Sequence, residues 1–279
     1  MMDTLVLFFI FIGLAILFSI IIFKHSKKVQ ITFTLFLVAF FLSLFFYRWL
    51  TTNRTDGDMI LRTNAETSID IVKLSDHVQL DAPVISQFPE LERGCEVTSL
   101  AMLLGHAGVV VDKMELAEKI KKNPEPYERK NGLIYFGHPN DGFVGDIYTR
   151  NNPGLGVYHK PIADLAQEYL PDGSVLDITG EPFDVIKLHL SMGRPVWVII
   201  NIQYKKLDDS MFETWITPRG KIKITYHEHS VLITGYDDQF IYFNDPYDGK
   251  RKKAVAKDFI EAWEQMGSQA ITYIPSENQ

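Results

Sequence analysis

Cysteine is the scarcest reactive residue in this chain of 279 residues, since Cys95 is its only example. A lone thiol cannot close a disulfide within the chain, and it cannot supply a four-cysteine metal cage. Two uses remain for Cys95: packing in the core, which is the commonest role of a free cysteine, and chemical reactivity. A domain of this length can fold without disulfides, so the composition is compatible with an extracellular location.

An excess of positive charge is also missing. Residues 55–279 carry 23 basic and 34 acidic side chains. Negative charge repels both the phosphates of nucleic acids and the anionic headgroups of a membrane surface. The sequence contains no internal repeat, no low-complexity tract and no nucleotide-binding motif. We therefore predict no nucleic-acid partner, no cofactor and no resident metal, and the sequence gives no indication of the oligomeric state.

Charged residues are absent from two long apolar stretches near the N-terminus. Residues 4–23 form the first stretch, and residues 31–46 form the second, which Tyr47 extends. Each is long enough to cross a hydrocarbon core of about 30 Å. A secretory signal is the competing interpretation, but it has a basic start and a shorter apolar region. We therefore predict two transmembrane helices, at about 4–23 and 31–49, within residues 1–50.

The basic loop between these stretches predicts the orientation. Residues 24–30 hold three lysines, and cytoplasmic loops are enriched in lysine and arginine. Arg48 and Arg54 oppose this orientation, because they lie beyond the second stretch. With the loop in the cytoplasm, both termini lie outside the cell. A polar linker at 51–77 then connects the bilayer to a domain at 78–275.

The domain changes character along its length. Apolar spacing and stop signals predict helices at 95–106, 113–121, 162–169 and 183–192. Continuous apolar or alternating runs predict strands at 196–200, 221–226, 230–236 and 240–244. A stretch rich in Gly, Pro and Asn separates the early helices from the later elements, at 131–156. Helices followed by strands indicate the α+β class.

Cys95 opens the first of these helices. Gly94 directly before it permits a tight approach of the backbone to neighbouring groups. A sulfur in the first turn of a helix lies near free N–H groups and the positive end of the helix dipole. Both lower the pKa of a thiol. We therefore expect Cys95 to be a nucleophile.

A histidine and an aspartate lie at matching ends of two predicted strands. His229 precedes the apolar run at 230–236, and Asp245 follows the strand at 240–244, with one hairpin turn between them. Hairpin pairing brings these two ends together, so the Asp245 carboxylate is expected near the His229 ring. A nucleophile needs a base, and the base needs a third group that fixes its tautomer. Alone, each residue is more typical of a surface position or a turn.

Five segments in order carry a resemblance to a known family. The chain resembles the papain-like group of bacterial cysteine peptidases that are similar to bacteriocin-processing peptidases, with peptidase C39-like domains, over residues 78–274. The segments are 87–104, 142–145, 228–237, 244–246 and 263–270. The resemblance implies a papain-like α+β fold with a catalytic triad of Cys95, His229 and Asp245. It also implies that Gln87 supplies an oxyanion-hole amide.

Together with the two predicted spans and the lysine loop, the resemblance predicts a membrane-anchored hydrolase of peptide, isopeptide or amide bonds at the outer face of a bacterial membrane. Its substrate is left open between a secreted peptide, a surface protein and a cell-wall cross-link. The bacteriocin-processing enzymes are fused to a transporter, whereas this chain has two predicted spans. Residues 140–145 either line the cleft or form a glycine turn with one core aromatic.

Two other functions remain as alternatives. The spacing of His227 and His229 is known among metal ligands, so a metal-dependent hydrolase is one alternative. No third histidine or carboxylate cluster lies near them in the sequence. A non-catalytic papain-like binding module, tethered to the membrane, is the other alternative. Such modules usually lose the nucleophile, and this chain keeps Cys95.

Overall fold

The computed structural model describes residues 74–275 of the chain. Within this range, no helix combines the length and the apolar character that crossing a bilayer requires. The two predicted spans at 4–23 and 31–49 lie outside the described residues, as does most of the predicted linker. Their prediction therefore stays a prediction.

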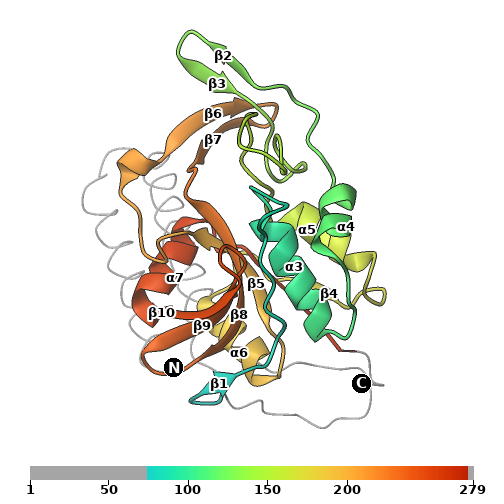
Figure 1. Cartoon of the computed structure of the whole chain (residues 1–279). Helices are drawn as coiled ribbons and strands as arrows, with labels where there is room; N and C mark the ends of the chain where they lie inside the picture. The colour runs from blue at the N-terminus through green and yellow to red at the C-terminus, as the bar shows by residue number, and fades with distance from the viewer. Residues whose placement is uncertain (1–73, 276–279) are drawn as a thin grey trace, which may run out of the picture. The chain divides into compact units, whose positions relative to one another are not determined.

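A seven-stranded sheet forms the centre of the described domain (Figure 1). Its strand order is β10-β9-β8-β5-β11-β4, with β1 paired to the far end of β8, and the neighbours are antiparallel. The strands are β1 (Val78–Gln79), β4 (Val175–Asp177), β5 (Val196–Asn201), β8 (Glu228–Tyr236), β9 (Phe240–Asp245), β10 (Lys250–Val255) and β11 (Ala270–Tyr273).

Helices cover both faces of this sheet (Figure 1). Successive residues of a strand point to opposite faces, and in β5 Trp197 and Ile199 join one core while Val196 and Val198 join the other. The first core lies under α3 (Cys95–His106), α4 (Lys113–Lys119) and α5 (His159–Gln167). The second lies under α6 (Phe183–Ser191) and α7 (Ala256–Gln265).

A smaller four-stranded sheet has a core of its own around the buried Trp215. Its order is β2-β3-β6-β7, and β3 and β6 run parallel. The strands are β2 (Glu128–Lys130), β3 (Leu133–Tyr135), β6 (Glu213–Thr217) and β7 (Gly220–Ile224), and the short helix η1 (Asp209–Met211) precedes β6. Part of this sheet comes from the stretch at 131–156, which had no predicted strand.

Most of the predicted elements are present. The helix predicted at 95–106 is α3, and the other predicted helices match α4, α5 and α6 to within a few residues. The predicted strands correspond to β5, β7, β8 and β9. Helix α7 and strands β1, β2, β3, β4, β6, β10 and β11 were not predicted. The prediction of the α+β class is confirmed.

Two buried contacts fix the start of α3 against the central sheet. The indole N–H of Trp197 on β5 donates to the backbone oxygen of Glu96 over 3.0 Å. Ser99 donates through its hydroxyl to the backbone oxygen of Ser230 on β8, over 3.2 Å. The first turn of α3 is therefore held against β5 and β8.

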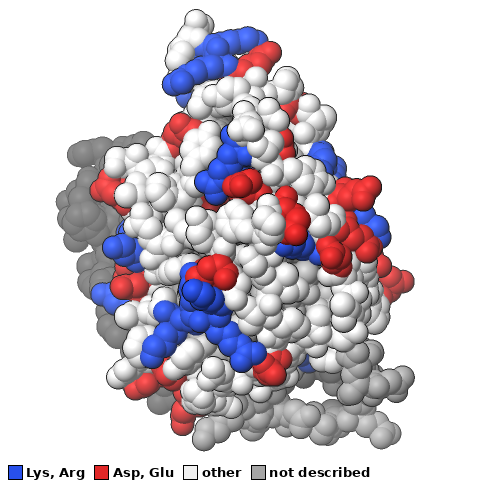
Figure 2. Space-filling model, in the orientation of Figure 1, with Lys and Arg blue, Asp and Glu red and all other residues white. Residues whose placement is uncertain are grey.

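Strand β10 is the exposed edge of the large sheet. Its first four residues are Lys250, Arg251, Lys252 and Lys253, and Figure 2 shows basic side chains gathered over this part of the surface. Charged side chains, lysine above all, discourage an edge strand from pairing with another chain. This explains why β10 lacks the apolar alternation by which strands are recognised.

Candidate active site

A cavity of about 270 Å³ opens beside the start of α3. It collects residues from the loop before α3, from α3 itself, from the segment at 150–155 and from β8. The lining residues are Gln87, Glu92, Arg93, Cys95, Arg150, Gly154, Leu155, Ile202, Tyr226, Glu228, His229 and Tyr247. Three of the four residues predicted to form the site, Gln87, Cys95 and His229, thus face one cavity.

Cys95 occupies the first position of α3 and is buried. Gly94 precedes it as the helix N-cap without a side-chain cap. A Cβ atom on Gly94 would lie 2.4 Å from Cβ of Leu91, so only glycine fits here without displacing Leu91. The sequence prediction of a tight approach at Gly94 is confirmed. The Cys95 thiol donates a hydrogen bond to Oε2 of Glu96 over 3.3 Å.

His229 and Asp245 are joined directly. Nε2 of His229 lies 2.8 Å from Oδ1 of Asp245, and both side chains are buried. The two residues lie on the neighbouring strands β8 and β9, near the ends opposite their connecting turn. An ionised carboxylate can only accept hydrogen bonds, so His229 carries a proton on Nε2. Its Nδ1 is then the nitrogen that remains for proton exchange.

Three further groups surround the Asp245 carboxylate. Oδ1 accepts from the backbone N–H of Tyr247 over 2.8 Å, and Oδ2 accepts from Lys252 over 2.6 Å and from the Tyr204 hydroxyl. Burial alone would raise the pKa of Asp245. The hydrogen bond and charge of His229, with the bonds from Lys252 and Tyr204, instead lower this pKa well below its usual value. Asp245 is therefore ionised.

Gln87 is almost fully buried in the loop before α3. Its Nε2 donates to the backbone oxygen of Leu91 over 3.0 Å, with a longer 3.4 Å contact to that of Glu92. Its Oε1 is buried without a hydrogen-bond partner among the described residues. The amide therefore holds the turn that leads into Cys95, and one of its N–H groups is weakly engaged.

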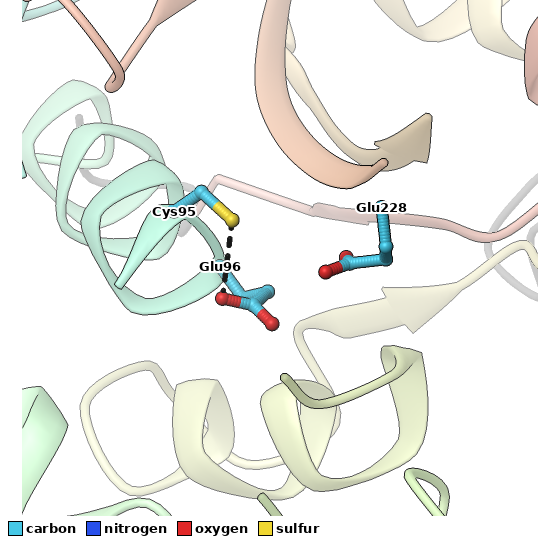
Figure 3. Close-up of side chains that lie close together, drawn as sticks. All are labelled: Cys95, Glu96 and Glu228. Carbon is cyan, nitrogen blue, oxygen red and sulfur yellow. Dashed lines mark hydrogen bonds between the residues drawn. The ribbon is translucent and has the colours of Figure 1, made fainter. Parts of the chain in front are cut away.

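Glu96 and Glu228 form a second constellation at the sulfur. Figure 3 shows their carboxylates facing each other beside the Cys95 sulfur, and one ligand atom from each of the three residues lies within 4.8 Å of the others. Oε1 of Glu96 accepts from the backbone N–H of Val157 over 2.8 Å. Burial raises the pKa of Glu96 to about 7. Burial, and then the charge of Glu96, raises the pKa of Glu228 well above its ordinary value.

The thiol pKa differs from the sequence-based prediction. Burial raises the pKa of the Cys95 thiol well above its ordinary value, and the charges of Glu96 and Glu228 raise it further. Only the backbone of Ser230 acts in the opposite direction. The prediction of a lowered thiol pKa is therefore wrong for the free protein, because the helix dipole is outweighed by burial and by two nearby carboxylates.

Two other expectations are settled by packing. Phe143 is fully buried in the core under α3, and the loop at 140–145 does not line the cavity, so the interpretation as a glycine turn with a core aromatic holds.

The N–H of His227 donates to the Thr225 hydroxyl, outside β8. Within residues 74–275, neither His227 nor His229 belongs to the group that could hold a metal ion, which consists of Cys95, Glu96 and Glu228.

The α+β architecture, with the cysteine on a helix and the histidine on the central sheet, defines a papain-like domain. The sequence model of the Peptidase_C39 like family matches residues 79–271. The chain belongs to this family, as the resemblance predicted.

Two proteins from Bacillus species are similar to this chain in sequence. The chain is 49% identical over 193 residues to YvpB of Bacillus subtilis (strain 168), a protein described as uncharacterized, and the match covers 69% of this chain and 71% of YvpB. A crystal structure provisionally described as a C39-like peptidase from Bacillus anthracis is 45% identical, with a TM-score of 0.67. It covers 72% of this chain and 99% of that chain.

A more distant match is xylellain, a cysteine protease from Xylella fastidiosa. It is 12% identical with a TM-score of 0.38, and the alignment covers 79% of this chain and 96% of that chain. No conclusion about the present chain depends on this match.

Four residues around the site were missed by the sequence analysis: Glu96, Glu228, Tyr204 and Lys252. A signal was present for the first two, because Glu96 directly follows Cys95 and Glu228 directly precedes His229. A carboxylate beside an otherwise apolar helix or strand is costly unless it has a role. Tyr204 and Lys252 gave no comparable signal, since their contact with Asp245 depends on the sheet order.

Proposed function

We propose that the protein is a cysteine peptidase that hydrolyses peptide, isopeptide or amide bonds through Cys95, His229 and Asp245. One observation carries the proposal. The buried Cys95 at the start of α3 shares its cavity with His229, and Nε2 of His229 lies 2.8 Å from the buried carboxylate of Asp245. Membership of a peptidase-like family supports the same reaction class.

The reaction follows from these positions. Nδ1 of His229 takes the proton of Cys95, and the thiolate attacks the substrate carbonyl carbon. The backbone N–H of Cys95 and the amide of Gln87 hold the negative oxygen of the tetrahedral intermediate. His229 then gives its proton to the leaving amine, and a water molecule, activated by the same ring, hydrolyses the thioester. Asp245 keeps the ring oriented and stabilises its charged form.

The proposed location combines this chemistry with the N-terminal sequence. The two spans predicted at 4–23 and 31–49 would anchor the peptidase, and the three lysines at 24–30 support a position of the domain at the outer face of a bacterial membrane. The substrate is then a peptide or protein that reaches the membrane surface from outside.

A non-catalytic binding module is the second candidate, and one observation favours it. The pKa of the Cys95 thiol is raised, so the sulfur is protonated in the free protein at neutral pH. A binding module has no use for a thiolate. For the peptidase, the thiolate must form when substrate changes the charge around the sulfur.

The experiment compares the full-length chain, purified in detergent, with its Cys95→Ala variant. Each is incubated with a peptide library, and products are identified by mass spectrometry. We expect cleavage by the wild type alone. A thiol-directed probe near neutral pH should also label Cys95 in the wild type faster than in His229→Ala, because the base is lost. Absence of cleavage together with equal labelling would establish the binding module.

A further inference from the structure

Most of the charged side chains that line the cavity at Cys95 already have hydrogen-bond or ion-pair partners. Among its acidic and basic side chains, Arg93 donates to three backbone carbonyl groups, and Nε of Arg150 lies 3.3 Å from the Glu92 carboxylate. Glu228 differs from them, because its Oε1 is buried with no hydrogen-bond partner in the described part of the chain. One unsatisfied carboxylate therefore remains in the cavity wall.

The unsatisfied carboxylate points toward the reacting sulfur. Figure 3 shows Glu228 directed toward Glu96 and Cys95, and the three ligand atoms lie within 4.8 Å of one another. Within residues 74–275, none of the lysine and arginine salt bridges is made to Glu96 or Glu228. Among the described residues, the charge of Lys122 acts on Glu96 and not on Glu228. Two adjacent buried carboxylates are costly to ionise together, so the pair takes up a proton or attracts a further positive group.

The backbone at Gly156 closes one side of the pair, and the cavity opens on another. A Cβ atom on Gly156 would lie 2.0 Å from Oε1 of Glu96 and 2.9 Å from Oε2 of Glu228, so the backbone closes that side. Glu96 is completely buried, whereas Glu228 is partly exposed and lines the cavity. A positive group therefore reaches the pair from the cavity, past the Cys95 sulfur.

We propose that Glu228 and Glu96 form a cation subsite that receives an ammonium or guanidinium group of the substrate beside the bond that is cleaved. The inference rests on the proposed peptidase function and names its substrate class: peptides with a lysine, an arginine or a free amine next to the scissile carbonyl. Binding of that group neutralises the carboxylates and so favours the Cys95 thiolate. Substrate binding and activation of the nucleophile are then linked.

A substrate cation fits the pair better than a metal ion. Cys95 is the third member of the only metal-like group within residues 74–275. A metal held there would bind the sulfur and block its attack on a carbonyl carbon. An ammonium or guanidinium group binds the two carboxylates and leaves the sulfur free.

The first test measures the charge beside the sulfur without any hydrolysis. Cys95 in the full-length chain is modified, in the presence of EDTA, by methanethiosulfonate reagents with an aminoethyl, a methyl or a sulfonatoethyl group. We expect the cationic reagent to react about tenfold faster than the neutral one after correction for their intrinsic rates, and the anionic reagent to be slowest. Glu228→Gln should bring this ratio close to one, whereas Glu228→Asp should keep most of it.

The second test measures the same preference in catalysis. Peptides that differ only by lysine or norleucine next to the cleaved bond are compared through kcat/KM. The lysine peptide should be favoured about tenfold or more, because a buried charge-assisted contact is lost in its neutral analogue. Glu228→Gln should abolish the preference. Glu92→Gln, which changes the other acid of the same cavity, should keep it.

Each result separates the two proposals. Charge-dependent modification without cleavage of any peptide would retain the cation subsite and reject the peptidase. An equal reagent ratio in the wild type and Glu228→Gln would overturn the subsite, even when peptides are cleaved. Loss of the lysine preference in Glu92→Gln would also overturn it. Protection of Cys95 from the reagents by micromolar Zn²⁺, in a buffer without EDTA, together with an equal reagent ratio in EDTA, would identify a metal site instead.

Discussion

Nε2 of His229 on β8 lies 2.8 Å from Oδ1 of Asp245 on β9, and both side chains are buried. The contact joins two strands that are neighbours in the sheet and separated by one hairpin in the sequence. Lys252 on the next strand reaches the other oxygen of the same carboxylate over 2.6 Å. Three consecutive strands thus determine the orientation of one imidazole ring.

His229 and His227 should differ sharply in their effect on catalysis. His229→Ala removes the proposed base and should lower kcat/KM by about 10⁴-fold or more. His227→Ala should change it by less than about threefold, because His227 contacts Thr225 rather than Asp245. Steady-state kinetics of both variants checks this. Equal losses in both variants, together with inactivation by chelators, would favour the metal-dependent hydrolase.

Gln87→Ala should leave slow but measurable hydrolysis. Loss of one oxyanion donor typically costs about 10²- to 10³-fold in rate, whereas Cys95→Ala removes the covalent step and should reduce activity to background. Alkylation of Cys95 by iodoacetamide should be retained in Gln87→Ala, since the base is intact. A loss of alkylation as well would show that Gln87 acts by holding the turn at Leu91 and Glu92.

Asp245→Asn should destabilise the protein in a pH-dependent way. The pKa of Asp245 is lower in the folded than in the unfolded state, so its ionised form stabilises the fold above about pH 4. This contribution is lost as the pH falls through the folded-state pKa. Urea unfolding should show a loss of about 3 kcal/mol at pH 7 that shrinks below pH 4. A difference that stays constant with pH would contradict the assignment.

Glu96→Gln should lower the pKa of the Cys95 thiol. Cys95 faces the carboxylates of Glu96 and Glu228 and shares its cavity with His229. Nearby, the charge of Lys122 acts on Glu96 in the opposite sense to burial. Removing the Glu96 charge, which develops as the pH rises through about 7, favours the thiolate.

The measurement is the rate of iodoacetamide alkylation as a function of pH. Its half-point should move to lower pH in Glu96→Gln and stay unchanged in Glu264→Gln, an exposed position on α7. A shift to higher pH in Glu96→Gln would show that the carboxylate assists deprotonation.

The membrane orientation can be checked on intact cells. If the lysine loop at 24–30 is cytoplasmic, protease added outside should digest the domain beyond residue 51. A cytoplasmic marker protein should stay intact in the same sample. Full protection of the domain while the membrane is sealed would place the peptidase inside the cell.

Much of the fold was readable from local patterns. Helix α3 matched its prediction because glycine and apolar spacing mark both of its ends, and β5 matched because it is buried on both faces. Strand β10 was missed because an exposed edge carries lysines where alternation was sought. Helix α7 has apolar residues at helical spacing, Phe259, Ala262 and Trp263, so a local signal for this helix was present in the sequence.

The site was less predictable than the fold. The positions of Cys95, His229 and Asp245 follow from short local motifs and one hairpin. The raised thiol pKa does not, because the burial that causes most of it arises only when α3 packs on β8, and the same packing brings in Glu228, which is 133 residues away in sequence. The sequence of a single helix shows its dipole but not a charge that a distant strand brings beside it. The network of Asp245 with Tyr204 and Lys252 was hidden for the same reason.

The indole of Trp197 limits how the helix that carries Cys95 can unfold. Its hydrogen bond to the backbone oxygen of Glu96 ties the first turn of α3 to β5, a strand buried along its whole length. The nucleophile therefore cannot separate from the sheet by fraying of a loop. Unfolding of this turn requires opening of the cooperative core, so the amide hydrogen of Thr98, which donates to the backbone oxygen of Gly94, should exchange as slowly as those of β5.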